Sequence, residues 1–180
     1  FSVDGTLIGT ETFAGPLAPG ASANFTFTTN FADLSTPGNT YTIQACTALV
    51  GDEDIVNDCF SKMVQHIAAN DVGVVAIVSP NSGSGLTATE TVEVTVENFG
   101  ALSQSNIPIE FTINGGAPVV ETVPGPIAPG ATVNYTFTVT ADLSTIGTYN
   151  VCSRTQLVGD QFPSNDETCK NVANLSCIPT

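Results

Sequence analysis

The sequence predicts an all-β protein made of two tandem antiparallel β-sandwiches, the first of which lacks its N-terminal strands. Three observations carry this prediction: runs of alternating polar and apolar residues, a long internal repeat, and two pairs of cysteines on equivalent hairpins. Alternation with a period of two residues is typical of a strand with one buried face. A repeat of this length indicates a duplicated module.

The strands of the second module give the clearest signal. In "TVEVTVEN" (91–98), Val92, Val94 and Val96 face one side and the polar residues between them face the other. Clusters of Gly, Pro or Asn bound this run and the similar runs, which are residues 72–79, 107–113, 118–123, 133–139, 148–154 and 168–173. Seven strands without a convincing helical segment are what an immunoglobulin-like sandwich requires.

The internal repeat covers two long motifs. "GPLAPGASANFTF" (15–27) recurs as "GPIAPGATVNYTF" (125–137). "ADLSTPGNTY" (32–41) then recurs as "ADLSTIGTY" (141–149). Matches of this quality predict that one module was duplicated to give the other.

The domain organisation follows from this alignment. We expect a partial module at residues 1–67, a complete module at 68–174, and the start of a linker or a further module at 175–180. Phe1 aligns with Phe111, so the first module begins in the middle of its third strand. The chain also starts without an initiator Met, and we expect it to be a piece of a longer polypeptide.

Residues 71–110 of the second module have no counterpart in the first. Without the two strands that they supply, one wall of the first core would be lost, beside the inward side chains Val3, Phe25, Phe27, Tyr41 and Ile43. We expect upstream residues of the same polypeptide to cover this face, with strands donated by a neighbouring molecule as the alternative. Phe25 and Phe27 should then be more exposed than their equivalents Tyr135 and Phe137.

Four of the five cysteines are explained by hairpin register. Facing residues of an antiparallel pair have position numbers with a constant sum. Cys152 and Cys169, translated to the first copy, fall on positions 44 and 61, which have the same sum as 46 and 59. The register predicts the disulfides Cys46–Cys59 and Cys152–Cys169, shifted by one rung on the outer face. A zinc site is the alternative, but zinc takes four ligands and the chain has a single His.

The disulfides predict the compartment. Such bonds persist where the surroundings are oxidising, so we expect an extracellular or cell-surface location. Cys177 is left over and most simply pairs with a cysteine of a downstream segment. No apolar run approaches the length of about 18 residues needed to span a bilayer, so direct membrane insertion is not expected.

The charge balance excludes several partners. Lys62, Arg154 and Lys170 are the only strong cations against 17 Asp and Glu, for a net charge of −14. Such a surface repels phosphate backbones and anionic headgroups, so nucleic acid is excluded. The strand register turns Lys62 and Lys170 inward at a sheet edge, where an inward charge blocks edge-to-edge pairing.

The acidic hairpin tips "GDEDIVND" (51–58) and "GDQFPSND" (159–166) are the best candidate sites. They offer hard oxygen ligands for calcium, from Asp52, Asp54, Asp58, Asp160, Asn165 and Asp166. Their spacing departs from an EF-hand, which needs a Gly at its sixth position and a terminal Glu. We favour the interpretation that these residues form turns by bonding to nearby backbone amides, and we expect no metal or cofactor.

Catalysis has weaker support. His66 is the one candidate base of its type, it lies at the junction of the modules, and no Ser or Cys nucleophile has a motif around it. A packing or hydrogen-bonding role is the more frequent one for such a residue. We expect no enzymatic activity.

The motif order resembles a known family. "DVGV", "TVEVTVENFG", "GPIAPGATVNYTFT", "IGTYNV" and "GDQFPSNDE" together resemble the CARDB modules, immunoglobulin-like repeats of secreted bacterial proteins. Residues 71–173 carry the whole pattern and 1–67 carry its second half. The tail "CIPT" is similar to segments before other modules in secreted proteins of Bacteroidota, which commonly leave the cell by the type IX route. The resemblance implies adhesion, spacing or substrate approach, and no catalysis.

We therefore predict tandem, non-catalytic structural or adhesive stalk modules of a large secreted or cell-surface protein. Ancillary modules that position a secreted hydrolase, a peptidase or glycosidase, on a polymeric substrate are the alternative. A carbohydrate-binding module is disfavoured, because the chain has no Trp and three Tyr to stack on sugars. The expected partners are flanking modules of the same polypeptide and a surface polymer, a glycan or another protein.

Overall fold

The structure is a computed structural model that describes residues 1–28 and 30–176. The chain divides into an N-terminal unit, Phe1–His66, and a C-terminal unit, Ile67–Thr180. Strands are the main regular structure of both, and the one helical element described is the short 3-10 turn η1 (Ile55–Asn57). The all-β class is confirmed. Cys177, with most of the predicted linker, lies outside the described residues.

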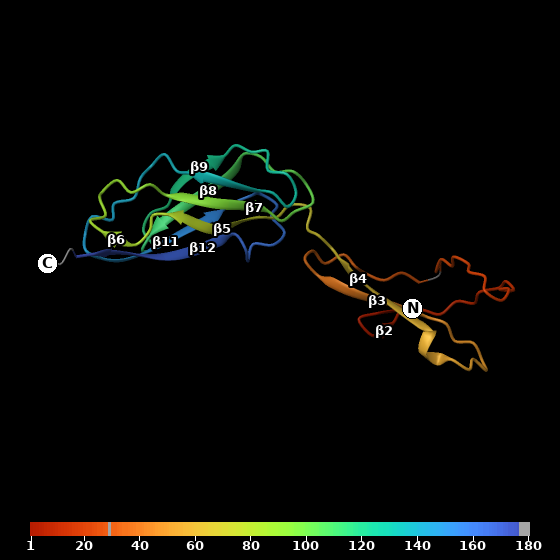
Figure 1. Ribbon diagram of the computed structural model, residues 1–180. Helices are drawn as coiled ribbons and strands as arrows, with labels where there is room; N and C mark the ends of the chain where they lie inside the picture. The colour runs from red at the N-terminus through yellow and green to blue at the C-terminus, as the bar shows by residue number, and fades with distance from the viewer. Residues whose placement is uncertain (29, 177–180) are drawn as a thin grey trace. The chain divides into compact units, whose positions relative to one another are not determined.

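The C-terminal unit contains two sheets (Figure 1). The first has the strand order β10-β7-β5, with β5 (Val72–Ser79), β7 (Glu93–Asn98) and β10 (Thr132–Thr136). The second has the order β6-β12-β11-β8-β9, with β6 (Gly83–Ser84), β8 (Ile107–Ile113), β9 (Val119–Val123), β11 (Gly147–Thr155) and β12 (Glu167–Leu175). The seven predicted strands are all present, and β6 is an addition.

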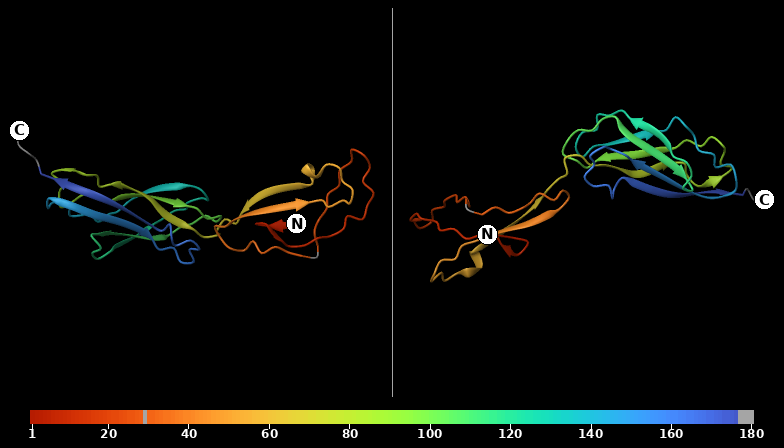
Figure 2. Two further views of the ribbon diagram at one scale, coloured as in Figure 1. Left: turned by 90° about the horizontal axis from the view of Figure 1, so that it is seen from below. Right: turned by 180° about the vertical axis from the view of Figure 1, so that it is seen from behind.

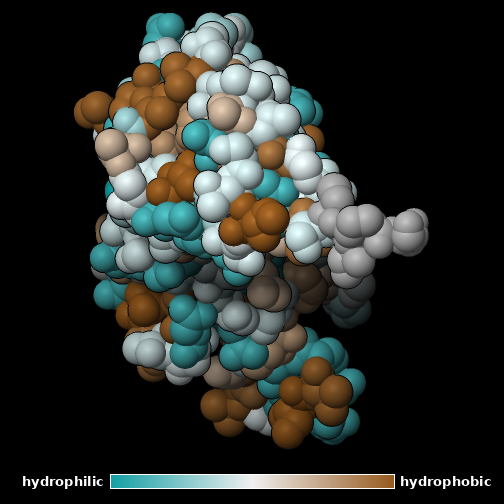
Figure 3. All heavy atoms as spheres, turned by 90° about the vertical axis from the view of Figure 1, so that its left-hand side faces the viewer, coloured by the Kyte–Doolittle hydropathy of each residue, from teal (hydrophilic) through white to brown (hydrophobic). Residues whose placement is uncertain are grey.

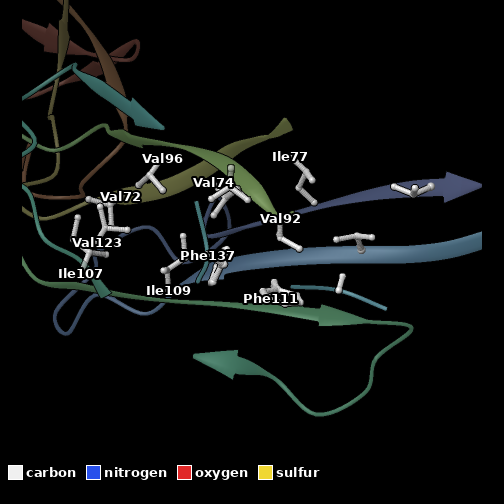
Figure 4. Packing of buried hydrophobic residues seen from close by; sticks show 14 of the residues in the cluster. Val72, Val74, Ile77, Val92, Val96, Ile107, Ile109, Phe111, Val123 and Phe137 are labelled. Carbon is white, nitrogen blue, oxygen red and sulfur yellow. The ribbon is translucent and has the colours of Figure 1, made fainter. Parts of the chain in front are cut away.

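The core of this unit lies between its two sheets. Val92, Val94 and Val96 are fully buried, as the alternation in this run predicts. Figure 4 shows side chains of β5 and β7 on one side of the core and those of β8 on the other, with Phe137 among them. Each buried valine of this kind stabilises the fold by roughly 1.5–3 kcal/mol, so this core accounts for the sandwich.

The end of one strand differs from the prediction because a carboxylate competes with the ladder. The run 133–139 was expected to be a single strand, but β10 ends at Thr136. The backbone N–H groups of Thr138 and Val139 donate to the carboxylate of Glu121 instead, at 2.9 and 3.2 Å. Alternation in the sequence does not reveal this side chain, which comes from β9.

Lys170 joins the two sheets of the C-terminal unit. The residue lies opposite Val151 and is half-buried, as its inward register predicts. Its Nζ donates to the carbonyl of Ile77 at 3.1 Å, to the carbonyl of Val78 at 3.4 Å, and to Oδ1 of Asn81 at 2.7 Å. The charged Nζ group therefore binds backbone carbonyls at the end of β5.

The N-terminal unit has one sheet of order β2-β1-β3-β4. Its strands are β1 (Ser2–Val3), β2 (Thr6–Leu7), β3 (Thr40–Cys46) and β4 (Cys59–Gln65). Figure 2 shows the chain between β2 and β3 as a long loop. Lys62, the equivalent of Lys170, is exposed here rather than inward, because no described strand of this unit takes the place of β5.

The predicted difference in aromatic exposure is confirmed. Phe25 is 42 % exposed and Phe27 is half-buried, whereas Tyr135 is half-buried and Phe137 is only 3 % exposed. Val3 and Tyr41 are the buried hydrophobic residues of the described N-terminal unit. This unit is therefore not a closed sandwich by itself.

Candidate functional site

The acidic tip of the C-terminal unit lies against the start of β5. Asp160 accepts the backbone N–H of Val72 on Oδ2 at 2.9 Å and that of Phe162 on Oδ1 at 2.8 Å. Gln161 accepts the N–H groups of Ala69 and Asn70 on its Oε1, at 2.7 and 3.2 Å. The tip thus holds the first residues of the unit in place through their backbone.

Two further carboxyl groups are buried beneath this tip. Asp71 is 7 % exposed and Asp166 is 4 % exposed. Asn165 donates its Nδ2 to Asp71 Oδ1 at 2.8 Å, and the Thr155 hydroxyl lies 3.3 Å from Asp166 Oδ1 and 2.9 Å from the carbonyl of Val72. Each acid therefore has a neutral hydrogen-bond partner.

The electrostatics of the pair follow from their burial. Loss of solvent is the main reason that the pKa of Asp71 and the pKa of Asp166 are both raised, and the nearby Asp160 carboxylate raises both further. The hydrogen bond from Asn165 opposes the shift of the Asp71 pKa, and that from Thr155 opposes the shift of the Asp166 pKa. The raised pKa values of Asp71 and Asp166 link the stability of the C-terminal unit to pH.

Gly73 explains how closely the tip approaches β5. A Cβ at this position would lie 2.3 Å from the backbone oxygen of Asn165, so only a glycine allows the contact. The side-chain Oδ1 of Asn165 is buried without a hydrogen-bond partner. The close packing of tip and strand therefore leaves one polar atom unsatisfied.

The N-terminal tip uses the same turn chemistry. Asp52 Oδ1 accepts the N–H of Asp54 at 3.1 Å, and Asp54 Oδ1 accepts that of Val56 at 3.2 Å, which caps η1. Asp58 Oδ1 accepts the hydroxyl of Thr47 at 2.9 Å. Five of the six calcium candidates accept hydrogen bonds through a carboxylate, and the sixth, Asn165, donates one. Calcium binding remains a prediction to be tested.

One group of potential metal-ligand atoms comes together in the part of the chain described. Cys152, Glu167 and Cys169 have ligand atoms within 4.8 Å of one another. Both sulfurs, however, form a disulfide. A disulfide sulfur has no thiolate to offer a cation, so this group is a cross-link and not a metal centre.

Both predicted disulfides are present. Cys46 is bonded to Cys59 and Cys152 to Cys169, with Cα atoms 4.1 and 4.0 Å apart. Each pair faces directly across its hairpin. The rung of the N-terminal unit that is equivalent to Cys152–Cys169 carries Gln44 and Ser61. The rung of the C-terminal unit that is equivalent to Cys46–Cys59 carries Arg154 and Glu167. The bridge slides by one rung without changing the face of the sheet.

His66 has a structural role in this geometry. Its Nδ1 lies 2.7 Å from the carbonyl oxygen of Leu34. Since a carbonyl only accepts, Nδ1 carries the proton in this contact. The ring thereby joins the end of β4 to the long loop of its unit.

Several polar residues that organise the fold were not found from the sequence. Asn98 is fully buried; its Nδ2 donates to the carbonyls of Leu102 and Ile127, both at 2.8 Å, and its Oδ1 accepts the N–H of Gly100 at 3.0 Å. The "ENFG" segment (97–100) after a strand was a usable signal for such a side-chain-bonded turn. Asp71 and Thr155 gave no local signal, because their partners are distant in the sequence.

Glu121 and Tyr135 form a second polar contact that the sequence did not reveal. The Tyr135 hydroxyl donates to Glu121 Oε2 at 2.7 Å. Desolvation, followed by the hydrogen bond and charge of Glu121, raises the pKa of Tyr135 to about 12. Burial opposes ionisation of Glu121, but hydrogen bonds from Thr138, Tyr135 and Val139 outweigh it and lower its pKa. This pair attaches β10 to β9.

Exposed hydrophobic residues are dispersed on the face drawn in Figure 3, where they occur as small groups between polar ones. Among the described residues, Val50, Val158 and Val56 are the most exposed valines, at 99, 91 and 89 %. Val50 and Val158 flank the two acidic tips, so each tip presents a similar mixed surface. Single exposed hydrophobic residues are ordinary on soluble proteins.

Residues 69–156 match the family model CARDB. Among solved structures, the chain is similar to the CARDB domain of PF1109 from Pyrococcus furiosus. The solution structure of that domain has 20 % identity, a TM-score of 0.48, and coverage of 61 % of this chain and 98 % of that one. A crystal structure of the same domain, titled as a complex with di-metal ions, has 19 % identity, a TM-score of 0.47, and coverage of 62 and 98 %. No curated protein matches the chain.

Proposed function

We propose, from the CARDB match at residues 69–156, that the two units are non-catalytic structural or adhesive stalk modules of a secreted or cell-surface multidomain protein. The observation that carries the proposal is the use made of the candidate site residues. Asp160 and His66 bind backbone groups. Asp166 and Asn165 bind Thr155 of β11 and Asp71, the residue before β5. Their chemistry serves to hold the module together.

A stalk must resist tension applied at its ends, and the C-terminal unit has a suitable arrangement. Its first strand, β5, is bonded to its last strand, β12, across the two sheets. Thr168 donates to the carbonyl of Val74, and Lys170 donates to the carbonyl of Ile77. Tension that enters at β5 and leaves at β12 therefore acts on these contacts directly.

The disulfide extends this resistance along the hairpin. Cys152–Cys169 joins β11 to β12 on the third rung of the ladder from the hairpin turn. Even when the non-covalent contacts give way, β12 cannot separate from β11 beyond this rung. Disulfides of this kind also support the proposed extracellular location, because they persist in an oxidising compartment.

Single-molecule stretching of the full chain tests the mechanical role. We expect the C-terminal unit to unfold in one abrupt step. Reduction should lengthen that step by the chain held between Cys152 and Cys169, a sequence separation of 17. Gradual extension at low force, without an abrupt step, would contradict a stalk function.

The alternative role, positioning a secreted hydrolase on a polymer, makes a different prediction. The full chain should then bind an insoluble polysaccharide or protein substrate, and a catalytic domain should adjoin it in the parent polypeptide. A long array of similar modules would favour the stalk. Export by the type IX route in a member of Bacteroidota belongs to the same proposal and is supported by the resemblance of the "CIPT" tail.

A further inference from the structure

The aromatic cluster of the N-terminal unit repeats that of the C-terminal unit. Phe1 and Phe25 have ring centroids 4.7 and 5.2 Å from that of Phe27. The equivalent distances in the C-terminal unit are 4.8 and 5.3 Å, from Phe111 and Tyr135 to Phe137. The clusters match although no strand equivalent to β5 or β7 is found in the described N-terminal unit.

A carboxylate fixes the same loop in both units. Glu11 accepts the backbone N–H of Thr28 at 2.7 Å and its hydroxyl at 3.4 Å. Glu121 accepts the same two groups of Thr138, at 2.9 and 2.7 Å. The segment that carries Phe25 and Phe27 is therefore already in the position that β10 and its following loop take in the complete module.

What is missing over this face is defined by the C-terminal unit. There, Val92, Val94 and Val96 pack into the core beside Phe137, and the Phe137 N–H donates to the carbonyl of Val92 at 2.9 Å. β10 pairs along its length with β7. The equivalent residues 22–26 have no strand assignment, and Phe25 is 42 % exposed.

A hollow marks where the missing chain would enter. It has a volume of about 250 Å³ and lies beside Phe1. In the C-terminal unit the equivalent space, between Val120 and Thr155, is filled by Ile109 and Glu110 of β8, which pair with Thr155 and Val120 respectively. The corresponding lining residues of the hollow are Thr10 and Thr47.

The register shows which strand would fill the hollow. Ser2 faces Gln44 and Val3 faces Ile43, as Thr112 faces Cys152 and Ile113 faces Val151 in the other unit. β1 thus occupies the place of the last residues of β8. A strand that continues β1 on the amino side of Phe1 runs directly into the hollow.

Three polar side chains complete the docking surface. In the C-terminal unit, Thr155 and Asp160 bind the carbonyl and the N–H of Val72 in β5, and Lys170 binds the carbonyl of Ile77 in the same strand. The N-terminal unit retains the same residue types at the equivalent positions, which are Thr47, Asp52 and Lys62. Lys62 is exposed. The groups that would bind the backbone of a strand are present without that strand.

We infer that this face is a docking site for a two-stranded antiparallel β segment with the alternating valines of β5 and β7, joined in cis to Phe1 by a strand that fills the hollow. Attachment in cis keeps the segment at a high effective concentration beside its site. The inference does not depend on the proposed stalk function, since it concerns how one module is completed.

A graft tests the inference on the full chain. Residues 71–110 are placed a second time, directly before Phe1, so that Glu110 is followed by Phe1 as it is by Phe111. Amide hydrogen exchange is measured for residues 22–28 in the original and grafted chains, with β10 as the internal standard for a covered strand. We expect exchange of the 22–28 amides to slow at least about tenfold in the graft, because opening now requires strand separation.

A matched graft with Val94→Asp in the added copy should not give this protection, because a charge then enters the apolar face. Within the valine graft, Lys62→Met should reduce protection of the added β5 segment, whereas Glu53→Gln on the exposed tip should not. The inference is overturned if residues 22–28 exchange equally fast in the graft, or if the Val94→Asp graft protects them equally. It is also overturned if the original chain is a dimer with these amides already protected, because a second copy then covers the face.

Discussion

Replacement of Lys170 by methionine tests the contact between the two sheets of the C-terminal unit. Methionine keeps the length and much of the volume of the side chain but removes the three hydrogen bonds from Nζ. Two of these are short, at 3.1 and 2.7 Å, and the third is longer, at 3.4 Å. A hydrogen bond from a charged group contributes about 1.5–3 kcal/mol when buried.

The residue is half-buried, so this contribution is reduced by solvent. Allowing about 1 kcal/mol for each short bond after this reduction, we expect Lys170→Met to lower the free energy of unfolding of the C-terminal unit by about 2 kcal/mol. The loss should appear as faster exchange of amides in β5 and β12. Hydrogen exchange resolves the two units separately, which a whole-chain melting curve does not.

The repeat supplies a matched control. Lys62→Met makes the same substitution at the equivalent position of the N-terminal unit, where the side chain is exposed. Its effect should lie within about 0.5 kcal/mol of zero, as for most surface substitutions. Equal effects of the two substitutions, or no effect of Lys170→Met, would refute the assignment of Lys170 as the link between the sheets.

Three further predictions concern the acids and the disulfides. Burial raises the pKa of Asp71 and of Asp166 above the unfolded value of 3.8, so the stability that they contribute is fully present below that value and is lost as pH rises through the raised pKa values. Asp166→Asn should flatten the pH dependence of the free energy of unfolding, measured with denaturant at several pH values. An unchanged slope would contradict this. Millimolar calcium should leave the melting temperature nearly unchanged, since Asp160 already accepts two N–H groups; a rise of several degrees that chelator reverses and Asp58→Ala or Asp160→Asn abolishes would show a calcium site. Selective loss of the Cys152–Cys169 bridge, by Cys152→Ser with Cys169→Ser, should cost the C-terminal unit about 3 kcal/mol by loop-closure entropy; a cross-module linkage in non-reducing peptide maps of the original chain would overturn the pairing.

Local periodicity was sufficient for most strands. β5 and β8 have the bounds expected from the runs 72–79 and 107–113, because turn residues follow each run. Alternation holds in β8, whereas two register shifts interrupt it in β5. The constant sum of facing positions was sufficient for both disulfides, since it depends only on hairpin geometry. These inferences needed only the residues of single strands and hairpins and the alignment of the two copies.

Contacts between segments that are distant in the sequence could not be predicted from local patterns. Asp71 and its partner Asn165 are separated by 94 positions, and nothing local marks Asp71 as buried. Lys62 and Lys170 occupy equivalent positions, yet only Lys170 reaches a neighbouring backbone, because β5 lies over it. The early end of β10 depends on Glu121 of another strand. In each case the deciding partner comes from elsewhere in the fold.

The contacts that tie β5 to β12 also constrain when the C-terminal unit can fold during synthesis. A ribosome makes β5 first and β12 last, so Val74 and Ile77 must wait for Thr168 and Lys170 before their carbonyls are bound. Contacts of such long sequence separation close late, because the loop entropy must be lost before they form. Oxidation is ordered in the same way, since Cys152 has no partner until Cys169 has emerged. The unit therefore remains open until almost its last residue is available, a state in which a chain can still be threaded through a narrow channel.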